Sequence, residues 1–291
     1  MDALPLVRLP AEKYGPWAVI AGGSEGIGAR IAHHLAESGI NLVLIARKCK
    51  PLEAVAAGLR AHVKVRLLAL DLTDAAMLDR VREATDDLEV GLLVYNAGAS
   101  HRTGPFVEWP LQDVLKVIRL NTEGQAMLAH HFGKKMAVRG RGGIILMGSL
   151  AGNAGSPSVV PYAGAKAFSQ IFAEGLWWEM KQRGVDVLHV VVGSTDTPAM
   201  KRLGIVYRKN QADDPDDVAR FTLENLAKGP VAVVPSMLDR FQKLATTDRS
   251  GATEMNGALV MGNTEGARQK AEQPSRDRPA PPTVTDPPRR Q

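Results

Sequence analysis

The feature that most constrains the fold of this chain is an alternation of short apolar runs with longer segments of helical period. The runs are rich in Val, Ile and Leu, which is typical of strands buried on both faces of a parallel sheet. The predicted strands are Trp17–Ala21, Asn41–Ala46, Val63–Ala69, Leu92–Tyr95, Gly143–Met147, Asp186–Val192 and Val231–Val234. The predicted helices are 26–38, 51–61, 74–86, 111–138, 161–183 and 215–227.

This alternation predicts an α/β fold. A strand, a helix and a second strand in succession form a right-handed crossover, so the strands become parallel and the helices cover both faces of the sheet. The pattern runs from residue 17 to residue 234 without a linker. A length of 291 residues would by itself favour about two domains. Because the pattern is continuous, we expect a single domain with a doubly wound parallel sheet of about seven strands.

Composition excludes several classes of protein. Lys and Arg outnumber Asp and Glu by 36 to 31, but they are spread along the chain, so no nucleic-acid partner is expected. No apolar run reaches the roughly 20 residues of a membrane span, and residues 1–10 do not resemble a secretory signal, so we expect a cytoplasmic protein. The single cysteine, Cys49, excludes an intramolecular disulfide. We expect no metal, because the neighbouring histidines His33-His34 and His130-His131 diverge on their helices.

A glycine-rich loop joins the first predicted strand to the first predicted helix. Gly22, Gly26 and Gly28 follow the pattern G-x-x-x-G-x-G. Glycines let the backbone approach a pyrophosphate, which the free N–H groups and the dipole of the following helix favour. The alternative is a tight turn that only packs on the sheet. The strand before the loop and the helix after it favour a dinucleotide cofactor over that alternative.

Further motifs follow the glycine loop in a fixed order. They are Asp71-Leu72 after the third predicted strand, Asn96-Ala97-Gly98 at the end of the fourth, Asn121 in the long helix, Ser149 at the end of the fifth strand, and Tyr162-x-x-x-Lys166. With the glycine loop, they resemble the classical short-chain dehydrogenase/reductase family over residues 15–235. The chain departs from that family at Ala21, where Thr is usual, and at Val192, where Pro usually precedes the glycine.

The resemblance implies a Rossmann-like fold, a nicotinamide cofactor and a homodimer or homotetramer in which helices 111–138 and 161–183 pair between subunits. It assigns catalysis to Asn121, Ser149, Tyr162 and Lys166. The residues that it places at the cofactor are Gly22, Ser24, Glu25, Gly26, Ile27, Gly28, Arg47, Asp71, Leu72, Asn96, Ala97, Gly98, Tyr162, Lys166, Gly193, Thr195 and Thr197.

Proton chemistry explains why Tyr162 and Lys166 would act together. Reduction of a carbonyl by hydride needs a proton donor, and a tyrosine with its ordinary pKa of about 10 is poorly matched to neutral pH. Residues four apart share a helix face, so the charge of Lys166 is expected to lower the pKa of Tyr162. Ser149 would bond to the substrate oxygen, and Asn121 would hold a water that links Lys166 to solvent. Each residue taken alone has a simpler alternative. Tyr162 and Lys166 would be a surface pair, Ser149 a turn-forming serine and Asn121 a solvated asparagine.

Arg47 bears on the choice of cofactor. NAD-binding folds of this kind place an acidic residue about 20 residues after the glycines, whereas a nearby arginine suits the 2′-phosphate of NADP. The second predicted strand is followed by Arg47-Lys48, with no acidic residue there. We therefore expect NADP(H) in preference to NAD(H), with a solvated basic turn as the alternative.

The expected activity is the NADP(H)-dependent interconversion of a ketone and a secondary alcohol by hydride transfer, with Tyr162 as proton donor or acceptor. An apolar carbonyl substrate, such as a 3-oxoacyl or steroid-like compound, is favoured by the side chains of three loops. Those loops are 99–110 with Phe106 and Trp109, 150–161, and 198–212 with Met200, Leu203, Ile205 and Tyr207. A non-catalytic NADP-binding regulator is the main alternative, because a fold alone does not enforce chemistry. A dehydratase or epimerase is less favoured, since the chain has no second large substrate domain.

These expectations divide the chain into three parts. Residues 1–14 form an N-terminal extension, and 15–262 form the dinucleotide-binding catalytic domain with the substrate loop 198–212. Residues 263–291 form a tail rich in Pro and Arg, whose composition predicts disorder.

Overall fold

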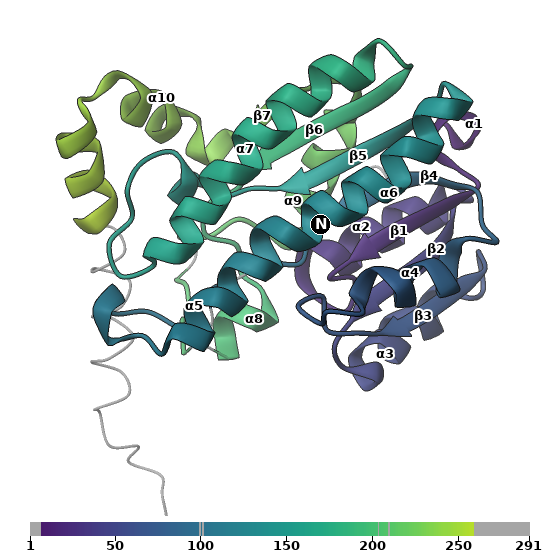
Figure 1. The fold of residues 1–291 in the computed structure, drawn as a ribbon, viewed down its shortest axis with the longest axis horizontal. Helices are drawn as coiled ribbons and strands as arrows, with labels where there is room; N and C mark the ends of the chain where they lie inside the picture. The colour runs from purple at the N-terminus through teal and green to yellow at the C-terminus, as the bar shows by residue number, and fades with distance from the viewer. Residues whose placement is uncertain (1–6, 99, 101, 203, 209, 259–291) are drawn as a thin grey trace, which may run out of the picture.

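A seven-stranded parallel sheet forms the centre of the molecule (Figure 1). The computed structural model describes residues 7–98, 100, 102–202, 204–208 and 210–258. The strands are β1 (Trp17–Ala21), β2 (Asn41–Ala46), β3 (Val65–Ala69), β4 (Val90–Tyr95), β5 (Gly142–Met147), β6 (Val185–Val191) and β7 (Val231–Val233). Their order in the sheet is β3-β2-β1-β4-β5-β6-β7. The chain reverses its direction of winding between β1 and β4, which is the point where ligands bind in doubly wound sheets.

Helices cover both faces of the sheet, as the alternation predicts. The longer ones are α2 (Gly26–Glu37), α3 (Cys49–Leu59), α4 (Met77–Thr85), α5 (Leu111–Ile118), α6 (Gly124–Arg139), α7 (Val160–Lys181), α9 (Pro215–Glu224) and α10 (Leu238–Thr246). Apolar side chains of α2, α3 and α9 pack on one face, and those of α4, α6 and α7 pack on the other. Because both faces are covered, successive residues of β1, β2, β4 and β5 are buried, which explains their continuous apolar composition.

The two largest differences between the structure and the sequence-based prediction concern helices. The predicted helix 111–138 is interrupted by a π-helical turn, η2 (Arg119–Glu123), which divides it into α5 and α6. Beyond residue 234, where no helix was expected, the chain forms α10 and a further helical segment at 249–258. Their apolar residues pack against Leu150 and Val191 and form a separate small core. The predicted tail, 263–291, lies outside the described residues.

The N-terminal segment packs against the sheet. The short helix α1 (Ala11–Tyr14) buries Tyr14, whose hydroxyl donates to Asp186 Oδ2 at 2.5 Å. Gly91 in β4 lies so close to this segment that a Cβ there would be 2.3 Å from the carbonyl oxygen of Gly15. The extension therefore contacts β4 and β6, although its proposed boundary at residue 14 stays a prediction.

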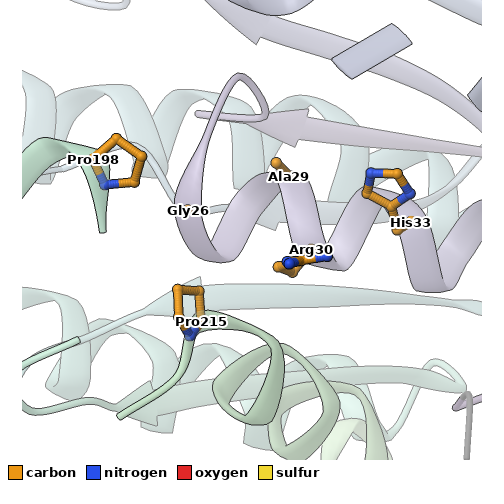
Figure 2. Close-up of a pocket in the computed structure, with 6 residues that line it drawn as sticks. All are labelled: Gly26, Ala29, Arg30, His33, Pro198 and Pro215. Atoms are coloured by element: carbon orange, nitrogen blue, oxygen red, sulfur yellow. The ribbon is translucent and has the colours of Figure 1, made fainter. Parts of the chain in front are cut away.

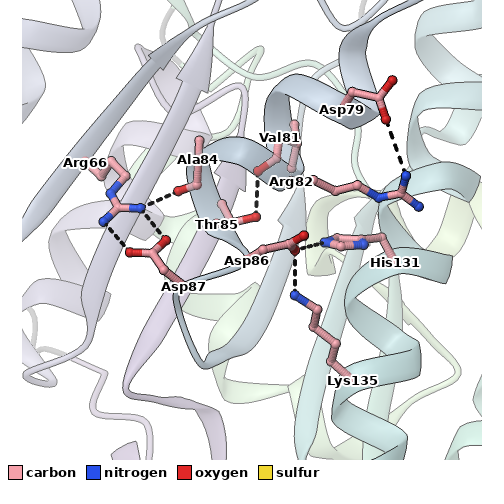
Figure 3. A network of polar contacts seen from close by, with 10 residues as sticks. All are labelled: Arg66, Asp79, Val81, Arg82, Ala84, Thr85, Asp86, Asp87, His131 and Lys135. Atoms are coloured by element: carbon pink, nitrogen blue, oxygen red, sulfur yellow. Dashed lines mark hydrogen bonds and ion pairs between the residues drawn. The ribbon is translucent and has the colours of Figure 1, made fainter.

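Ion pairs join α4 and its following turn to neighbouring elements (Figure 3). Asp86 accepts from Lys135 Nζ at 2.6 Å and lies 3.3 Å from His131 Nε2, both on α6. The hydrogen bond from Lys135 is the main reason why the pKa of Asp86 is lowered. Arg66 of β3 pairs with Asp87 at 2.7 Å. The carboxylates of Asp86 and Asp87 are exposed, so we expect their pairs with Lys135 and Arg66 to contribute little to stability.

In the part of the chain that the structure describes, no helix has the length and apolar character needed to span a membrane. No group of three or more His, Cys, Asp or Glu side chains in that part could hold a metal ion. Cys49 is exposed. The cytoplasmic location expected from the sequence stays a prediction.

The bond between Tyr14 and Asp186 gives a test of how α1 contributes to stability. We expect Tyr14→Phe to keep the buried ring but to lower the free energy of unfolding by about 1–2 kcal/mol, because a hydrogen bond to a charged group is lost while Lys13 still pairs with Asp186. In a chain of this size that corresponds to a fall in Tm of a few degrees, measured by thermal denaturation. Tyr207→Phe is the control, and equal Tm values for the two variants would contradict the prediction.

Candidate active site

The glycine loop between β1 and α2 has a backbone that only glycine allows. Gly22 and Gly26 have φ values of +86° and +55°, in the region that disfavours other residues. A Cβ on Gly28 would lie 2.1 Å from the carbonyl oxygen of Gly22 and 2.7 Å from Asn96 Nδ2. Asn96 Nδ2 donates to that same carbonyl at 3.0 Å. The loop is therefore closely packed against the end of β4 and leaves no room for side chains at its glycines.

The first turn of α2 faces a cleft of about 290 Å³ (Figure 2). Its lining residues are Gly26, Ala29, Arg30, His33, Pro198 and Pro215. Thr197 lies directly against Gly26, since a Cβ there would be 3.0 Å from the threonine methyl group. The cleft adjoins the glycine loop and does not include Ser149 or Tyr162. Bare glycines at the start of a helix, with a threonine opposite them, fit the diphosphate of a dinucleotide.

Glu25, which precedes α2, is paired across this loop. Arg202, at the end of α8 (Pro198–Arg202), donates to both carboxylate oxygens of Glu25, with Nη1 to Oε2 at 2.7 Å. The pair joins the predicted substrate loop to the glycine loop. Arg202 also offsets a negative charge that would otherwise lie beside a bound diphosphate. No local sequence pattern indicated that Arg202 pairs with Glu25, because Arg202 and Glu25 are 177 positions apart.

Arg47, Asp71 and Leu72, three of the predicted cofactor residues, follow the ends of β2 and β3. Arg47 is exposed at the end of β2, and Leu72 is buried. Asp71 Oδ1 accepts from the backbone N–H of Thr73 at 3.0 Å and from its hydroxyl at 2.8 Å. Burial acts to raise the pKa of Asp71, but these bonds and the charges of Lys116 and Arg47 outweigh burial and lower it. Asp71 is therefore an ionised acceptor that is already oriented.

The remaining predicted cofactor residues lie around the same edge of the sheet. Ala97 follows Asn96 and packs on the core, and Ile27 packs on the opposite face. Gly193 lies against Met237, because a Cβ there would be 2.3 Å from its sulfur. Thr195 forms a β-bridge with Asp213. Ser24 is half-buried within the glycine loop.

Ser149, Tyr162 and Lys166 meet at the end of β5. Ser149 is held in place by its neighbours, since Gly148 N–H donates to Val190 at 2.7 Å and Leu150 N–H to Val192 at 2.9 Å. Tyr162 and Lys166 lie one turn apart on α7, and the side chain of Tyr162 is close enough to Ser149 for the serine to affect its pKa. Lys166 is buried and donates from Nζ to the Met147 carbonyl at 2.8 Å. The structure thus brings these three predicted catalytic residues together.

The protonation behaviour of this cluster differs from the sequence-based expectation. Burial raises the pKa of Tyr162, and the nearby Ser149 side chain opposes that rise only in part. Burial also lowers the pKa of Lys166 to about 8. Lys166 Nζ is 5.5 Å from the centre of the Tyr162 ring and is engaged by the Met147 carbonyl. The expected lowering of the tyrosine pKa by Lys166 is therefore wrong for the protein alone, because desolvation is the larger effect.

Asn121 lies in the π-helical turn and points towards Lys166. Its side chain is buried, and Nδ2 donates to the Val117 carbonyl at 2.9 Å. None of the described residues donates to Oδ1. A Cβ on Gly98 would lie 2.4 Å from that Oδ1 and 3.1 Å from Lys166 Nζ. Asn121 therefore offers a buried acceptor beside the lysine, as expected of a residue that holds a polar group there.

An apolar wall adjoins Tyr162. Trp109 is buried with Val114 and Val117, and Tyr162 packs against this cluster. Trp109 Nε1 donates to the Gly104 carbonyl at 3.2 Å. Of the other expected wall residues, Phe106 is exposed, and Met200, Ile205 and Tyr207 are half-buried, whereas Leu203 lies outside the described residues.

Sequence reasoning missed several polar residues behind the site. Tyr95, Gln125, Ser169 and His189 are buried and bond to each other or to the turn that carries Asn121. His189 had a usable signal, because a lone histidine inside an apolar strand needs a buried partner. The other three had no local signal.

Comparison with known proteins agrees with this geometry. A family model described as short chain dehydrogenase matches residues 16–205. The 7beta-hydroxysteroid dehydrogenase of Clostridium sardiniense is 33% identical over 210 residues, which cover 72% of this chain and 77% of that protein. A very-long-chain 3-oxoacyl-CoA reductase of Neurospora crassa is 34% identical over 197 residues, covering 66% of this chain but only 59% of the reductase.

Solved structures give the same result. A structure described as giving insights into 7beta-hydroxysteroid dehydrogenase stereoselectivity has a TM-score of 0.79 and 25% identity, and the match covers 84% of this chain and 98% of the other. A short-chain dehydrogenase from Sphingobium yanoikuyae in complex with NADPH has a TM-score of 0.70 and 29% identity, covering 91% and 98%. Since the family model also matches more than half of the residues, this chain belongs to the short-chain dehydrogenase family.

Proposed function

We propose that the protein is an NADP(H)-dependent oxidoreductase that interconverts an apolar ketone and a secondary alcohol. The observation that carries this proposal is the meeting of Ser149, Tyr162, Lys166 and Asn121 at the ends of β4 and β5. This cluster lies at the same edge of the sheet as the glycine loop. One site therefore contains a proton donor, an oxygen-binding hydroxyl and a diphosphate cradle.

Each catalytic side chain has a defined task in this proposal. The bound nicotinamide supplies or accepts the hydride. The hydroxyls of Ser149 and Tyr162 bind the carbonyl oxygen, and Tyr162 gives its Oη proton to that oxygen as negative charge develops. The raised pKa of Tyr162 keeps this proton in place at neutral pH. Lys166, held by the Met147 carbonyl, keeps a positive charge close to the tyrosine. Asn121 Oδ1 holds a water molecule beside Lys166, and this water gives the proton a route from solvent.

NADP(H) is the proposed cofactor, in preference to NAD(H). Arg47 is exposed at the end of β2, and Asp71, whose charge interacts with it, accepts both of its hydrogen bonds from Thr73. The second strand is not followed by an acidic residue of its own, and an exposed arginine there favours a 2′-phosphate. The Sphingobium relative, described in complex with NADPH, supports the same choice.

The proposed substrate class follows from the wall of the site and from the relatives. Trp109 and its apolar neighbours pack against Tyr162, so the substrate flank beside the reacting carbon is apolar. The relatives in Clostridium and Neurospora are described as acting on hydroxysteroids and very-long-chain 3-oxoacyl-CoA. We therefore infer a steroid-like, 3-oxoacyl or similar apolar carbonyl substrate for this chain.

Replacing Tyr162 tests the mechanism. Tyr162→Phe removes only the hydroxyl, so NADPH affinity and Tm are expected to stay close to those of the parent, while turnover falls by about 100-fold or more. Lys166→Ala should reduce both turnover and NADPH affinity. The assay follows the loss of reduced-nicotinamide absorbance with a panel of apolar ketones. Near-normal turnover in the Phe variant would refute the assigned role, and a parent that binds NADPH but reduces no ketone would favour a regulator.

Replacing Arg47 tests the cofactor preference. We expect Arg47→Ala to weaken NADPH binding by about 10- to 100-fold, because one charge-assisted bond to the 2′-phosphate is lost, and to leave NADH binding almost unchanged. Binding is measured by quenching of protein fluorescence. Lys64→Ala removes an exposed charge elsewhere and is the control. An equal loss for both cofactors would mean that Arg47 does not contact the phosphate.

We further propose a homodimer or homotetramer that pairs α5 and α7. On α7, Phe168, Ile171 and Trp178 are exposed on one face, with Ile171 68% exposed, and Leu111 and Leu115 are exposed on α5. Apolar side chains gathered on adjoining helices are typical of a buried interface.

A charge placed on this face tests the assembly. Ile171→Glu is expected to shift the protein to monomer in light scattering after size exclusion, because burying the new carboxylate is costly. Val206→Glu, a comparably exposed position in the 198–212 loop, should leave the mass unchanged. If the parent is already a monomer, the proposed pairing is wrong.

A further inference from the structure

The π-helical turn that carries Asn121 is held by side chains from outside it. Tyr95, the last residue of β4, donates from its hydroxyl to the Leu120 carbonyl at 2.6 Å. Gln125, in the first turn of α6, donates from Nε2 to the Asn121 carbonyl at 2.7 Å. A π turn disturbs the regular bonding of a helix and is frequent at functional sites. These two donors therefore stabilise the unusual backbone that aims Asn121 at Lys166.

Gln125 is the first member of a longer buried chain. Its Oε1 accepts from the Ser169 hydroxyl of α7 at 2.9 Å, and Ser169 Oγ is 3.4 Å from His189 Nδ1 of β6. Gln125, Ser169 and His189 are each at most 3% exposed. The chain thus joins α6, α7 and β6 directly behind the catalytic cluster.

The Asn121 carbonyl fixes the direction of every bond in this chain. A carbonyl can only accept, so Gln125 must present Nε2 to it and Oε1 to Ser169. Ser169 then donates its one hydroxyl proton to Gln125 Oε1, so it must accept a hydrogen bond from His189. His189 therefore carries its proton on Nδ1. Burial and the charge of Lys166 lower the pKa of His189 to about 3, so the ring is neutral at pH 7.

The His189 end of the hydrogen-bond chain contacts Gly148, the residue between β5 and Ser149. A Cβ on Gly148 would lie 2.1 Å from His189 Nε2, so the imidazole packs directly on the backbone of Gly148. The buried chain of hydrogen bonds therefore runs from the π turn that carries Asn121 to the backbone of Gly148. This glycine lies between Met147, which accepts from Lys166, and Ser149.

We propose that Gln125, Ser169 and His189, braced by Tyr95, are positioning residues that fix the π turn and so hold Asn121 Oδ1 beside Lys166 in the catalytic arrangement. The inference rests on the proposed reductase function for its catalytic consequence. The direction of the hydrogen bonds does not depend on that function. The two parts are therefore tested by separate measurements.

The hydrogen-bond directions are tested by NMR of protein labelled in its histidines. The spectrum of the imidazole nitrogens distinguishes the two neutral tautomers, and His189→Asn identifies the signal of His189. We expect the Nδ1–H tautomer in the parent at neutral pH. Gln125→Met removes the acceptor of the Ser169 proton, so the serine can donate to His189 and the tautomer should change to Nε2–H. An Nε2–H tautomer in the parent, or no change in the variant, would overturn the assigned chain.

The positioning role is tested by separating turnover from binding. Gln125→Met is expected to lower kcat by about 10- to 100-fold, the scale of a small misplacement of a catalytic group. Its Kd for NADPH should stay within about twofold of the parent value, since no residue of the buried hydrogen-bond chain is placed at the cofactor. Tyr95→Phe, which removes the second donor to the turn, should show the same split. His189→Asn keeps a donor near Nδ1 and should retain more turnover than His189→Leu.

Thr222→Val is the matched control. Thr222 is fully buried on α9, and its hydroxyl donates to the Val218 carbonyl at 2.7 Å, far from Asn121 in the fold. This variant should lose stability without losing kcat at a temperature where it is folded. Normal kcat in Gln125→Met would refute the positioning role. A parent that reduces no ketone would overturn the proposed function and this catalytic role together, while the tautomer result would still decide the hydrogen-bond chain.

Discussion

The hydrogen bond from Asn96 to the Gly22 carbonyl is the contact on which the rest of the site depends. It fixes the glycine loop to the end of β4, and it does so at a separation that excludes a side chain on Gly28. Two residues after Asn96, Gly98 lies against both Asn121 and Lys166. The end of one central strand therefore sets the position of the diphosphate cradle and of the catalytic cluster at the same time. A shift at this strand end would move both.

The sequence was sufficient for features that depend on local requirements. The seven strands were predictable because burial on both faces demands continuous apolar runs, and their parallel direction followed from the right-handed crossovers of α/β units. The glycine loop was predictable because positive φ values at Gly22 and Gly26 need glycine whatever the surroundings. The family resemblance named Ser149, Tyr162 and Lys166 from motifs in separate parts of the sequence, and the structure brings these three side chains together.

Features that depend on distant partners were not predictable. Residues 111–138 were predicted as one helix because helical period does not distinguish a π turn from an α-helical turn. The apolar face is in fact interrupted there, since the buried residues at the turn are Asn121, Gly124 and Gln125. The donors that occupy its carbonyls come in part from Tyr95, which lies 25 residues earlier. The pKa of Tyr162 was predicted in the wrong direction for a similar reason. Spacing places Lys166 near the tyrosine, but it does not reveal that the lysine is buried and the tyrosine partly buried, or that the Met147 carbonyl accepts a hydrogen bond from the lysine.

Three of the proposed catalytic side chains use part of their hydrogen-bonding capacity for positioning and keep the rest for a ligand. Lys166 gives one proton to the Met147 carbonyl, Asn121 gives its Nδ2 to Val117, and Ser149 accepts from the N–H of Ala151 at 3.2 Å. The remaining lysine protons, the asparagine Oδ1 and the serine hydroxyl proton can then serve a ligand. Backbone partners within strands and helices move little, so these groups need little reorganisation when charge develops. The fold that buries them raises the cost of leaving them unpaired, and the same burial makes their electrostatic effect on a bound carbonyl larger than it would be in water.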